Sequence, residues 1–171
     1  MATADANMNP RPLIGEEISL VDDKGRLSMS KAKRERLGEN FALVLGAMGC
    51  LEAYPLLAWL KMFDEIERHP MLSEAKRTFE RMLLGTAVDD LSFDTQGRVV
   101  IPQSLREAAK IRGGVKIIGC GNRVEIWSIE RWEQFSEDVE KFSTPRSRKM
   151  AAAYEQMTGQ ASAPAVSAVD A

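Results

Sequence analysis

The feature that most constrains the fold of this chain is a pentapeptide that occurs twice. Residues 22–26 read Asp-Asp-Lys-Gly-Arg, and residues 94–98 read Asp-Thr-Gln-Gly-Arg. Both fit D-x-x-G-R, a tight-turn pattern, because Asp can accept a hydrogen bond from the backbone two residues on and Gly reaches a positive φ without strain. The predicted turn-forming residues are Asp22, Gly25, Asp94 and Gly97. Each turn then presents an arginine, Arg26 or Arg98, at the start of a strand.

The sequence around the pentapeptides repeats as well, which predicts a fold made of two similar halves. Arg34 and Glu35 match Arg106 and Glu107 at an offset of 72, and Glu52 matches Glu125 at an offset of 73. Each half has the pattern strand, turn, strand, short helix, hairpin, helix. A unit of about 45 residues is too small to bury a core alone, so we expect the two halves to pack by pseudo-twofold symmetry.

Hydrophobic periodicity gives the predicted organisation of the chain. Alternating residues predict strands around both turns, and helical spacing predicts an αα-hairpin between the two halves. After Ser143, the basic residues Arg146, Arg148 and Lys149 and an Ala-rich stretch suggest a flexible end, either without contacts or as an auxiliary DNA arm. The expected segments are a disordered leader (1–15), a first repeat (16–60), a helical hairpin linker (61–86), a second repeat (87–135), and a helix end with a disordered tail (136–171).

Several function classes find no support in the sequence. The chain has one histidine and no glycine-rich phosphate loop, H-E-x-x-H motif or nucleophile elbow, so we expect neither an enzyme nor a metal or cofactor site. Two cysteines are too few for a disulfide framework, and no run of about 18 apolar residues suggests a membrane span. These features predict a soluble cytoplasmic protein.

The chain resembles the MraZ family, bacterial regulators built from two SpoVT/AbrB-like (swapped-hairpin) repeats, over approximately residues 16–135. The resemblance rests on both pentapeptides, on Ile101-Pro102 with Leu105-Arg106-Glu107, and on three further stretches. These stretches are Cys-Leu-Glu-Ala-Tyr-Pro-Leu-Leu-Ala-Trp at 50–59, Arg-Met-Leu-Leu-Gly-Thr-Ala at 81–87, and Gly-Asn-Arg-Val-Glu-Ile-Trp at 121–127.

The resemblance implies a mainly β protein with flanking helices (α+β), organised as a pseudo-twofold, AbrB-like swapped-hairpin (double-split) β-barrel. It also implies a DNA-binding transcriptional regulator that acts at short direct repeats in the promoter of the division and cell-wall gene cluster. Members form ring-shaped homo-oligomers, so an octamer or dodecamer associated with the nucleoid is expected.

The two turn arginines have two compatible interpretations. Arg26 and Arg98 can contact a phosphate or a guanine edge, because the planar guanidinium fork suits both. Each can instead bond the Asp of its own turn. The full set of predicted DNA-binding residues is Arg26, Arg98, Lys24, Lys31, Lys33, Arg34 and Arg106. Lys31, Lys33 and Arg34 could equally form a solvated helix face.

Local charge suggests that the two turns are unequal. The net charge of the chain is −2, so DNA binding must depend on local patches. Residues 24–36 carry six positive and one negative side chain, whereas residues 94–116 carry five and two. We therefore expect the first turn to bind DNA more strongly than the second.

Two other functions stay open at this level. One is a dimeric AbrB-type antitoxin or global regulator. The other is a protein-interaction scaffold that uses the aromatic residues recurring at matched positions, although core or subunit packing explains these residues better than base stacking does. The aromatic residues are Tyr54, Trp59, Trp127 and Trp132.

Overall fold

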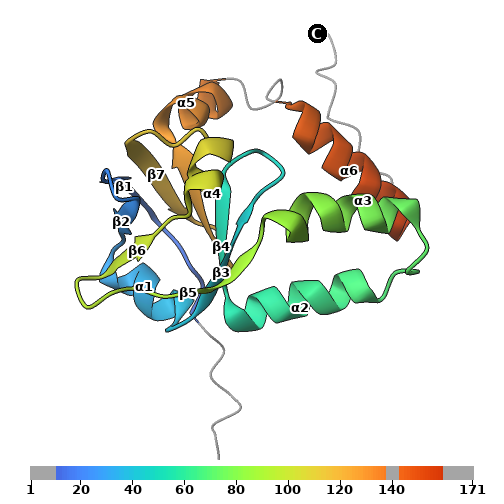
Figure 1. Ribbon diagram of the computed structural model, residues 1–171, viewed down its shortest axis with the longest axis horizontal. Coiled ribbons are helices and arrows are strands. Elements are labelled where there is room, and N and C mark those ends of the chain that lie inside the picture. Colours follow the sequence, from blue (N-terminus) through green and yellow to red (C-terminus); the bar gives the residue numbers. More distant parts are fainter. Residues whose placement is uncertain (1–10, 138–142, 160–171) are drawn as a thin grey trace, which may run out of the picture.

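The computed structural model describes residues 11–137 and 143–159, which form a mainly antiparallel β-structure with helices on the outside (Figure 1). Within these ranges, no helix is both long and apolar enough to cross a membrane. The strands are β1 (Glu16–Leu20), β2 (Arg26–Ser28), β3 (Phe41–Leu45), β4 (Leu51–Pro55), β5 (Val88–Leu91), β6 (Arg98–Val100), β7 (Gly114–Gly119) and β8 (Val124–Ser128). The helices are α1 (Lys31–Leu37), α2 (Leu56–Glu67), α3 (Glu74–Leu83), the 3-10 helix η1 (Leu84–Thr86), α4 (Gln103–Ala108), α5 (Ile129–Glu137) and α6 (Pro145–Thr158).

The two halves exchange strands, which explains why neither half needs a core of its own. The larger sheet has the order β1-β7-β8-β4-β3-β5, so β1 of the first half pairs with β7 of the second, and β5 of the second half pairs with β3 of the first. Strands β2 and β6 form a separate two-stranded sheet. Because β1 and β5 are the edges of an open sheet, the predicted closed barrel is not confirmed.

The register of β2 and β6 puts both turn arginines on one face. Leu27 pairs with Val99, and both side chains are buried in the main core. Directly paired residues share a face, and successive residues alternate between faces. The neighbouring pairs, Arg26 with Val100 and Ser28 with Arg98, therefore lie together on the outer face of this sheet.

A second core lies on the outer face of the larger sheet. Helices α2, α3 and α6 cover β3 and β4 there, with Tyr54 and Trp59 among the buried residues. On the other half, Trp127 is buried and packs edge-on against Trp132, with ring centroids 5.7 Å apart. Core packing is therefore confirmed for Tyr54, Trp59 and Trp127, whereas Trp132 is half-buried against Trp127.

The structure corrects the predicted ends of the folded region. Leu13, expected within a disordered leader, is buried and bridges Gly121 through backbone hydrogen bonds of 2.8 and 2.7 Å. Residues 145–158, expected in a flexible end, form α6, because Thr144 and Ser147 make a capping box and Pro145 suits the first turn. The other residues of the predicted leader (1–10), helix end (138–142) and tail (160–171) lie outside the described residues.

Helix α6 is held to the other half by Arg146. Its Nε donates to the carbonyl oxygen of Gly46 over 3.0 Å, and its Nη2 donates to those of Leu45 and Met82 over 2.6 Å. Burial lowers the pKa of this guanidinium, which still binds three carbonyl oxygens. Arg146 is therefore a structural residue, and neither the flexible segment nor the DNA arm describes its position.

We expect Arg146→Ala to lower the free energy of unfolding by about 2–4 kcal/mol, because hydrogen bonds to a charged group are lost and carbonyl oxygens are left unsatisfied. Chemical denaturation followed by circular dichroism measures this change. Arg148→Ala, an exposed position on the same helix, is the matched control and should change stability by less than about 0.5 kcal/mol. Equal effects of the two substitutions would contradict the assigned role.

Candidate nucleic-acid interface

In the first turn, Asp22 organises both the backbone and the arginine. Its Oδ1 accepts hydrogen bonds from the backbone N–H groups of Lys24 (3.0 Å) and Arg26 (2.9 Å), and its Oδ2 accepts from Arg26 Nε over 2.6 Å. Gly25 has φ of 79°, a conformation that favours glycine. The backbone N–H of Arg26, followed by its guanidinium, holds the pKa of Asp22 below its usual value. Asp22 is therefore ionised at neutral pH.

The second turn has the same geometry. Asp94 Oδ1 accepts from the N–H groups of Gln96 and Arg98, each over 2.9 Å, and Oδ2 accepts from Arg98 Nε over 3.0 Å. The backbone N–H of Arg98 is also the main cause of a lowered pKa at Asp94. Gly97 has φ of 74°. The same three hydrogen bonds to the Asp side chain thus recur in both turns, so the repeat is present in the structure as well as in the sequence.

The predicted pairing of each arginine with its own Asp is confirmed, and it leaves part of each arginine accessible. The side chains of Arg26 and Arg98 are 31% and 27% exposed. Arginine has five N–H donors in a rigid fork, and the Asp fixes the direction in which that fork points. The two interpretations of these arginines are therefore compatible.

Each turn is completed by an arginine from the other half. Arg106 of α4 donates from Nε to the carbonyl oxygen of Ile101 over 3.0 Å, and its guanidinium lies against Gly25, where a Cβ would come within 3.0 Å of Cζ. The backbone N–H of Ile101 in turn donates to the Gly25 carbonyl oxygen over 2.8 Å. The glycine is needed for the positive φ and also for the space that Arg106 fills.

The reciprocal contact joins the first half to the second turn. Arg34 of α1 donates from Nε to the carbonyl oxygen of Met29 over 3.0 Å, and a Cβ on Gly97 would lie 2.7 Å from its Cζ. We call these two contacts the crossed arginines: Arg106 on the Gly25 turn and Arg34 on the Gly97 turn. Both arginines are among the residues predicted from the sequence, but the turn that each one meets depends on contacts between the halves, which no local pattern encodes.

The structure contradicts the assignment of the basic run to the first turn. Lys33 is buried, with Nζ 3.5 Å from a Glu17 carboxylate oxygen, and Arg34 lies at the second turn. Arg36 donates to the Pro12 carbonyl oxygen over 2.9 Å. Of the predicted DNA-binding residues on α1, only Lys31 is fully exposed, 3.6 Å from Glu35.

The net charge around each turn in the folded chain therefore differs from the net charge counted along the sequence. With its crossed arginine, the first turn has three cations (Lys24, Arg26, Arg106) and two carboxylates (Asp22, Asp23). The second turn has two cations (Arg98, Arg34) and one carboxylate (Asp94). Each composite turn has an excess of one positive charge, so the basis for unequal turns is lost.

A family model described as "MraZ protein, putative antitoxin-like" matches the chain twice, over residues 13–82 and 82–153. The chain belongs to the MraZ family. A protein of Finegoldia magna named "Transcriptional regulator MraZ" is 39% identical over 125 residues, which are 73% of this chain and 87% of that protein. A protein of the same name from Caldicellulosiruptor saccharolyticus is 40% identical over 126 residues, 74% of this chain and 87% of that protein.

The matches to the MraZ family model extend beyond the strands into the helices. The first match includes α2 and α3, and the second includes α5 and most of α6. Helix α6 is then the counterpart of α3 in the second half, and both helices begin with a hydroxyl cap, Thr144 and Ser73. We infer that each repeat contains its own helix pair.

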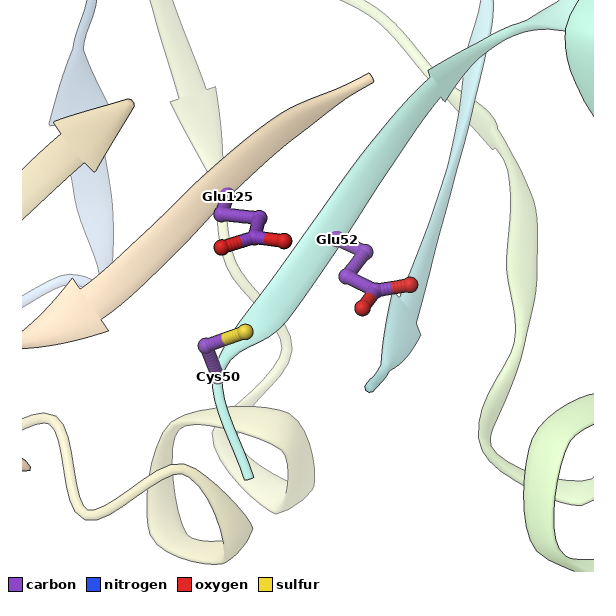
Figure 2. Close-up of side chains that lie close together, drawn as sticks. All are labelled: Cys50, Glu52 and Glu125. Carbon is purple, nitrogen blue, oxygen red and sulfur yellow. The ribbon is translucent and has the colours of Figure 1, made fainter. Parts of the chain in front are cut away.

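A second cluster of polar groups lies where the halves meet, at the pair β4–β8. Glu52 pairs with Glu125 across these strands, and the sulfur of Cys50 points toward both carboxylates (Figure 2). The ligand atoms of these three residues lie within 4.8 Å of one another. Sequence analysis did not predict this cluster, although the matched positions of the two glutamates could have indicated it.

This cluster is explained by hydrogen bonds within the protein. Glu52 accepts from the Tyr54 hydroxyl over 2.6 Å, and Glu125 accepts from Arg123 Nη2 over 2.6 Å and from Trp127 Nε1 over 2.9 Å. Burial raises the pKa of Glu52 and that of the Cys50 thiol. Thiolate and carboxylate are metal ligands by type, but these carboxylates are already engaged and Arg123 supplies the compensating charge.

The crossed arginines predict crossed effects. Arg34→Gln should perturb the backbone amide resonance of Gly97, and Arg106→Gln that of Gly25, because each guanidinium lies against the glycine of the other half's turn. Each substitution should lower the free energy of unfolding by about 1–2 kcal/mol, since a half-buried charged hydrogen bond is lost. Two-dimensional NMR of the glycine amides measures the first effect.

Lys31→Gln is the matched control for this experiment, because Lys31 lies on α1 but is exposed. It should leave both glycine resonances in place and change stability by less than about 0.5 kcal/mol. The crossed contact would be refuted if Arg34→Gln perturbed Gly25 and left Gly97 unchanged.

Proposed function

We propose that this chain is a sequence-specific DNA-binding transcriptional regulator that contacts double-stranded DNA through its two D-x-x-G-R turns. The observation that carries the proposal is the outer face of the β2–β6 sheet, from which Arg26 and Arg98 both project while Leu27 and Val99 anchor the same strands in the core. A phosphate or a guanine edge suits the guanidinium forks that Asp22 and Asp94 orient. Lys24 and Lys31 add exposed charge nearby.

The comparisons support regulation of transcription, because the relatives are named for it. The family resemblance further implies short direct repeats in the promoter of the division and cell-wall gene cluster as the target. Nucleoid association in the cytoplasm follows if the chain binds such DNA. The swapped-hairpin barrel belongs to the same proposal, and the exchange of β1 and β5 between halves supports it.

Within this proposal the predicted site residues have different roles. Arg26, Arg98, Lys24 and Lys31 are the direct contacts, because they are at least partly exposed at or near the turns. Arg34 and Arg106 position the turns, and their charge adds to the positive potential there. Lys33 holds α1 through its buried pair with Glu17.

A homo-oligomeric ring completes the proposal, because one chain has few cationic contacts and a net charge of −2. A few phosphate contacts bind weakly at physiological salt. Identical turns spaced around a ring can engage several DNA repeats together, so that avidity supplies both affinity and selectivity for repeat number. An octamer or dodecamer, as the resemblance implies, would present such an array.

A dimeric antitoxin-like regulator is the second candidate, favoured by the description "antitoxin-like" of the matching family model. Light scattering separates the two candidates, since a ring has several times the mass of two 19.0 kDa chains. A protein scaffold, the third possibility, predicts no salt-dependent binding to DNA.

Arg26→Ala and Arg98→Ala should each weaken binding to the DNA upstream of the chain's own gene, by about 5- to 100-fold if the arginine pairs with a guanine. Because the composite turns carry equal excess charge, we expect similar losses. Each lost phosphate contact should also reduce the slope of log K against log salt by about 0.9. Fluorescence anisotropy at several salt concentrations measures both quantities.

Arg77→Ala, an exposed arginine on α3, removes the same charge away from the turns and should leave affinity nearly unchanged. Light scattering must give the wild-type mass for every variant. Undiminished binding by both turn variants at that mass would exclude the turns as the DNA contacts.

Simultaneous binding of several turns makes affinity depend on the number of DNA repeats. Disrupting one DNA repeat of several should reduce affinity by more than about tenfold, because the remaining contacts lose the gain from simultaneous binding. Anisotropy titrations of DNAs with one, two and three intact repeats measure this effect. An affinity per repeat that does not depend on repeat number would contradict it.

A further inference from the structure

Several large apolar side chains of the first half are exposed, and two groups of them lie on regular elements, the helix α2 and the strand β1. On α2, Leu57, Leu60 and Phe63 are 58%, 49% and 39% exposed, and we call these three residues the helix patch. On β1, Ile18 and Leu20 are each 71% exposed, and we call these two residues the strand patch. Spacings of three along a helix and two along a strand put the members of each patch on one side of its element.

The second half provides an internal control for both patches. The positions on α5 that match the helix patch at the offset of 73 are Glu130, Glu133 and Ser136. The positions on and after β5 that match the strand patch at the offset of 72 are Asp90 and Ser92. All five are exposed, like their partners, but all five are polar.

The polar residues of the second half show that the fold does not require apolar side chains at these exposed positions. The same backbone positions, equally exposed, tolerate charged and hydroxyl side chains in one half of the same molecule. Packing within the chain therefore does not explain the apolar residues in the other half. Clustered apolar side chains that a fold does not need indicate a surface that is covered in the working assembly.

The two patches cannot cover each other within one chain. Strand β1 forms one edge of the six-stranded sheet, whereas α2 follows β4 near the other end of the sheet order. Figure 1 shows the hairpin of α2 and α3 projecting from the side of the molecule opposite the label of β1. A contact between the patches therefore requires two copies of the chain.

The size of the two patches, and the fact that one contact can cover both, favour a second copy of the chain as the binding partner. A standard interface buries about 800 Å² on each partner, a little over half of it apolar. Each patch consists of large apolar side chains that are 39–71% exposed, and such side chains form the core of an interface of this kind. One patch-to-patch contact thus supplies an apolar core for one such interface. It also covers both patches with one kind of contact, whereas unrelated partners would require two different binding events.

We propose that the helix patch of one copy packs on the strand patch of the next copy. The contact is heterologous, since it joins two different surfaces, and repetition of a heterologous contact generates a ring when its rotation closes. This inference rests on the homo-oligomer of the proposed function and identifies the surfaces that build it.

The test replaces each patch with residues that the second half already carries. The helix variant is Leu57→Glu with Leu60→Glu, and the strand variant is Ile18→Asp with Leu20→Ser. Light scattering after size-exclusion chromatography should show each variant falling from the wild-type mass to that of one 19.0 kDa chain. Circular dichroism verifies the fold; if the strand variant unfolds, Ile18→Thr with Leu20→Thr replaces it, because Thr favours strands.

Mixing the two variants tests whether the patches meet each other. Each variant keeps one intact patch, so an equimolar mixture should form pairs of one chain of each kind and nothing larger. Glu130→Ala with Glu133→Ala, at the matched positions of α5, is the control and should keep the wild-type mass.

The possible failures are distinguishable. A wild-type protein that is a single chain at micromolar concentration overturns the proposed ring together with this interface. A wild-type oligomer whose mass survives either folded patch variant overturns the interface alone. A patch variant that forms pairs with itself shows that its intact patch meets its own kind. A mixture that stays as single chains shows that the two patches do not meet each other. Either result overturns the heterologous contact.

Discussion

The structure depends on one reciprocal contact between its halves: the β2–β6 pairing and the crossed arginines that flank it. Leu27 and Val99 meet in the core beneath this two-stranded sheet, and each turn glycine receives a guanidinium from the other half. Neither half can therefore form its turn surface alone. A chain of two small repeats gains one shared core and one shared outer face from the same interaction.

This reciprocity also determines what the turns can present. An arginine on a three-residue strand would ordinarily sample many rotamers, at a cost in entropy on binding. Here the Asp of the turn holds Nε, and the neighbouring guanidinium limits the movement of the backbone at Gly25 and Gly97. Both guanidinium groups are preorganised, so less side-chain entropy is lost when they bind an anionic group.

Sequence predicted the parts of this arrangement that depend on neighbours along the chain. The Asx-type turns, the strand alternation, the β7–β8 hairpin and the capped helix after Ser73 all follow from local patterns, and the structure contains each of them. Contacts between halves were not accessible in this way. A run of cations at 31–36 looks uniform in sequence, whereas in three dimensions Lys33 is buried on Glu17 and Arg34 lies on the opposite turn. Arg146 likewise gave no signal of the distant carbonyl oxygens that it binds.

Because the two halves share one fold, a residue in one half can be compared with the residue at the matched position in the other. Positions that are the same in both halves, such as Gly25 with Gly97 and Arg34 with Arg106, take part in the reciprocal contact that both halves need. Positions that are exposed in both halves but differ in polarity, such as Leu60 with Glu133, do not take part in that contact. The twofold contact thus fixes the two D-x-x-G-R turns in equivalent settings. Apolar residues on α2 and β1 have polar counterparts in the other half, and the proposed directional assembly of identical chains needs two such unlike surfaces.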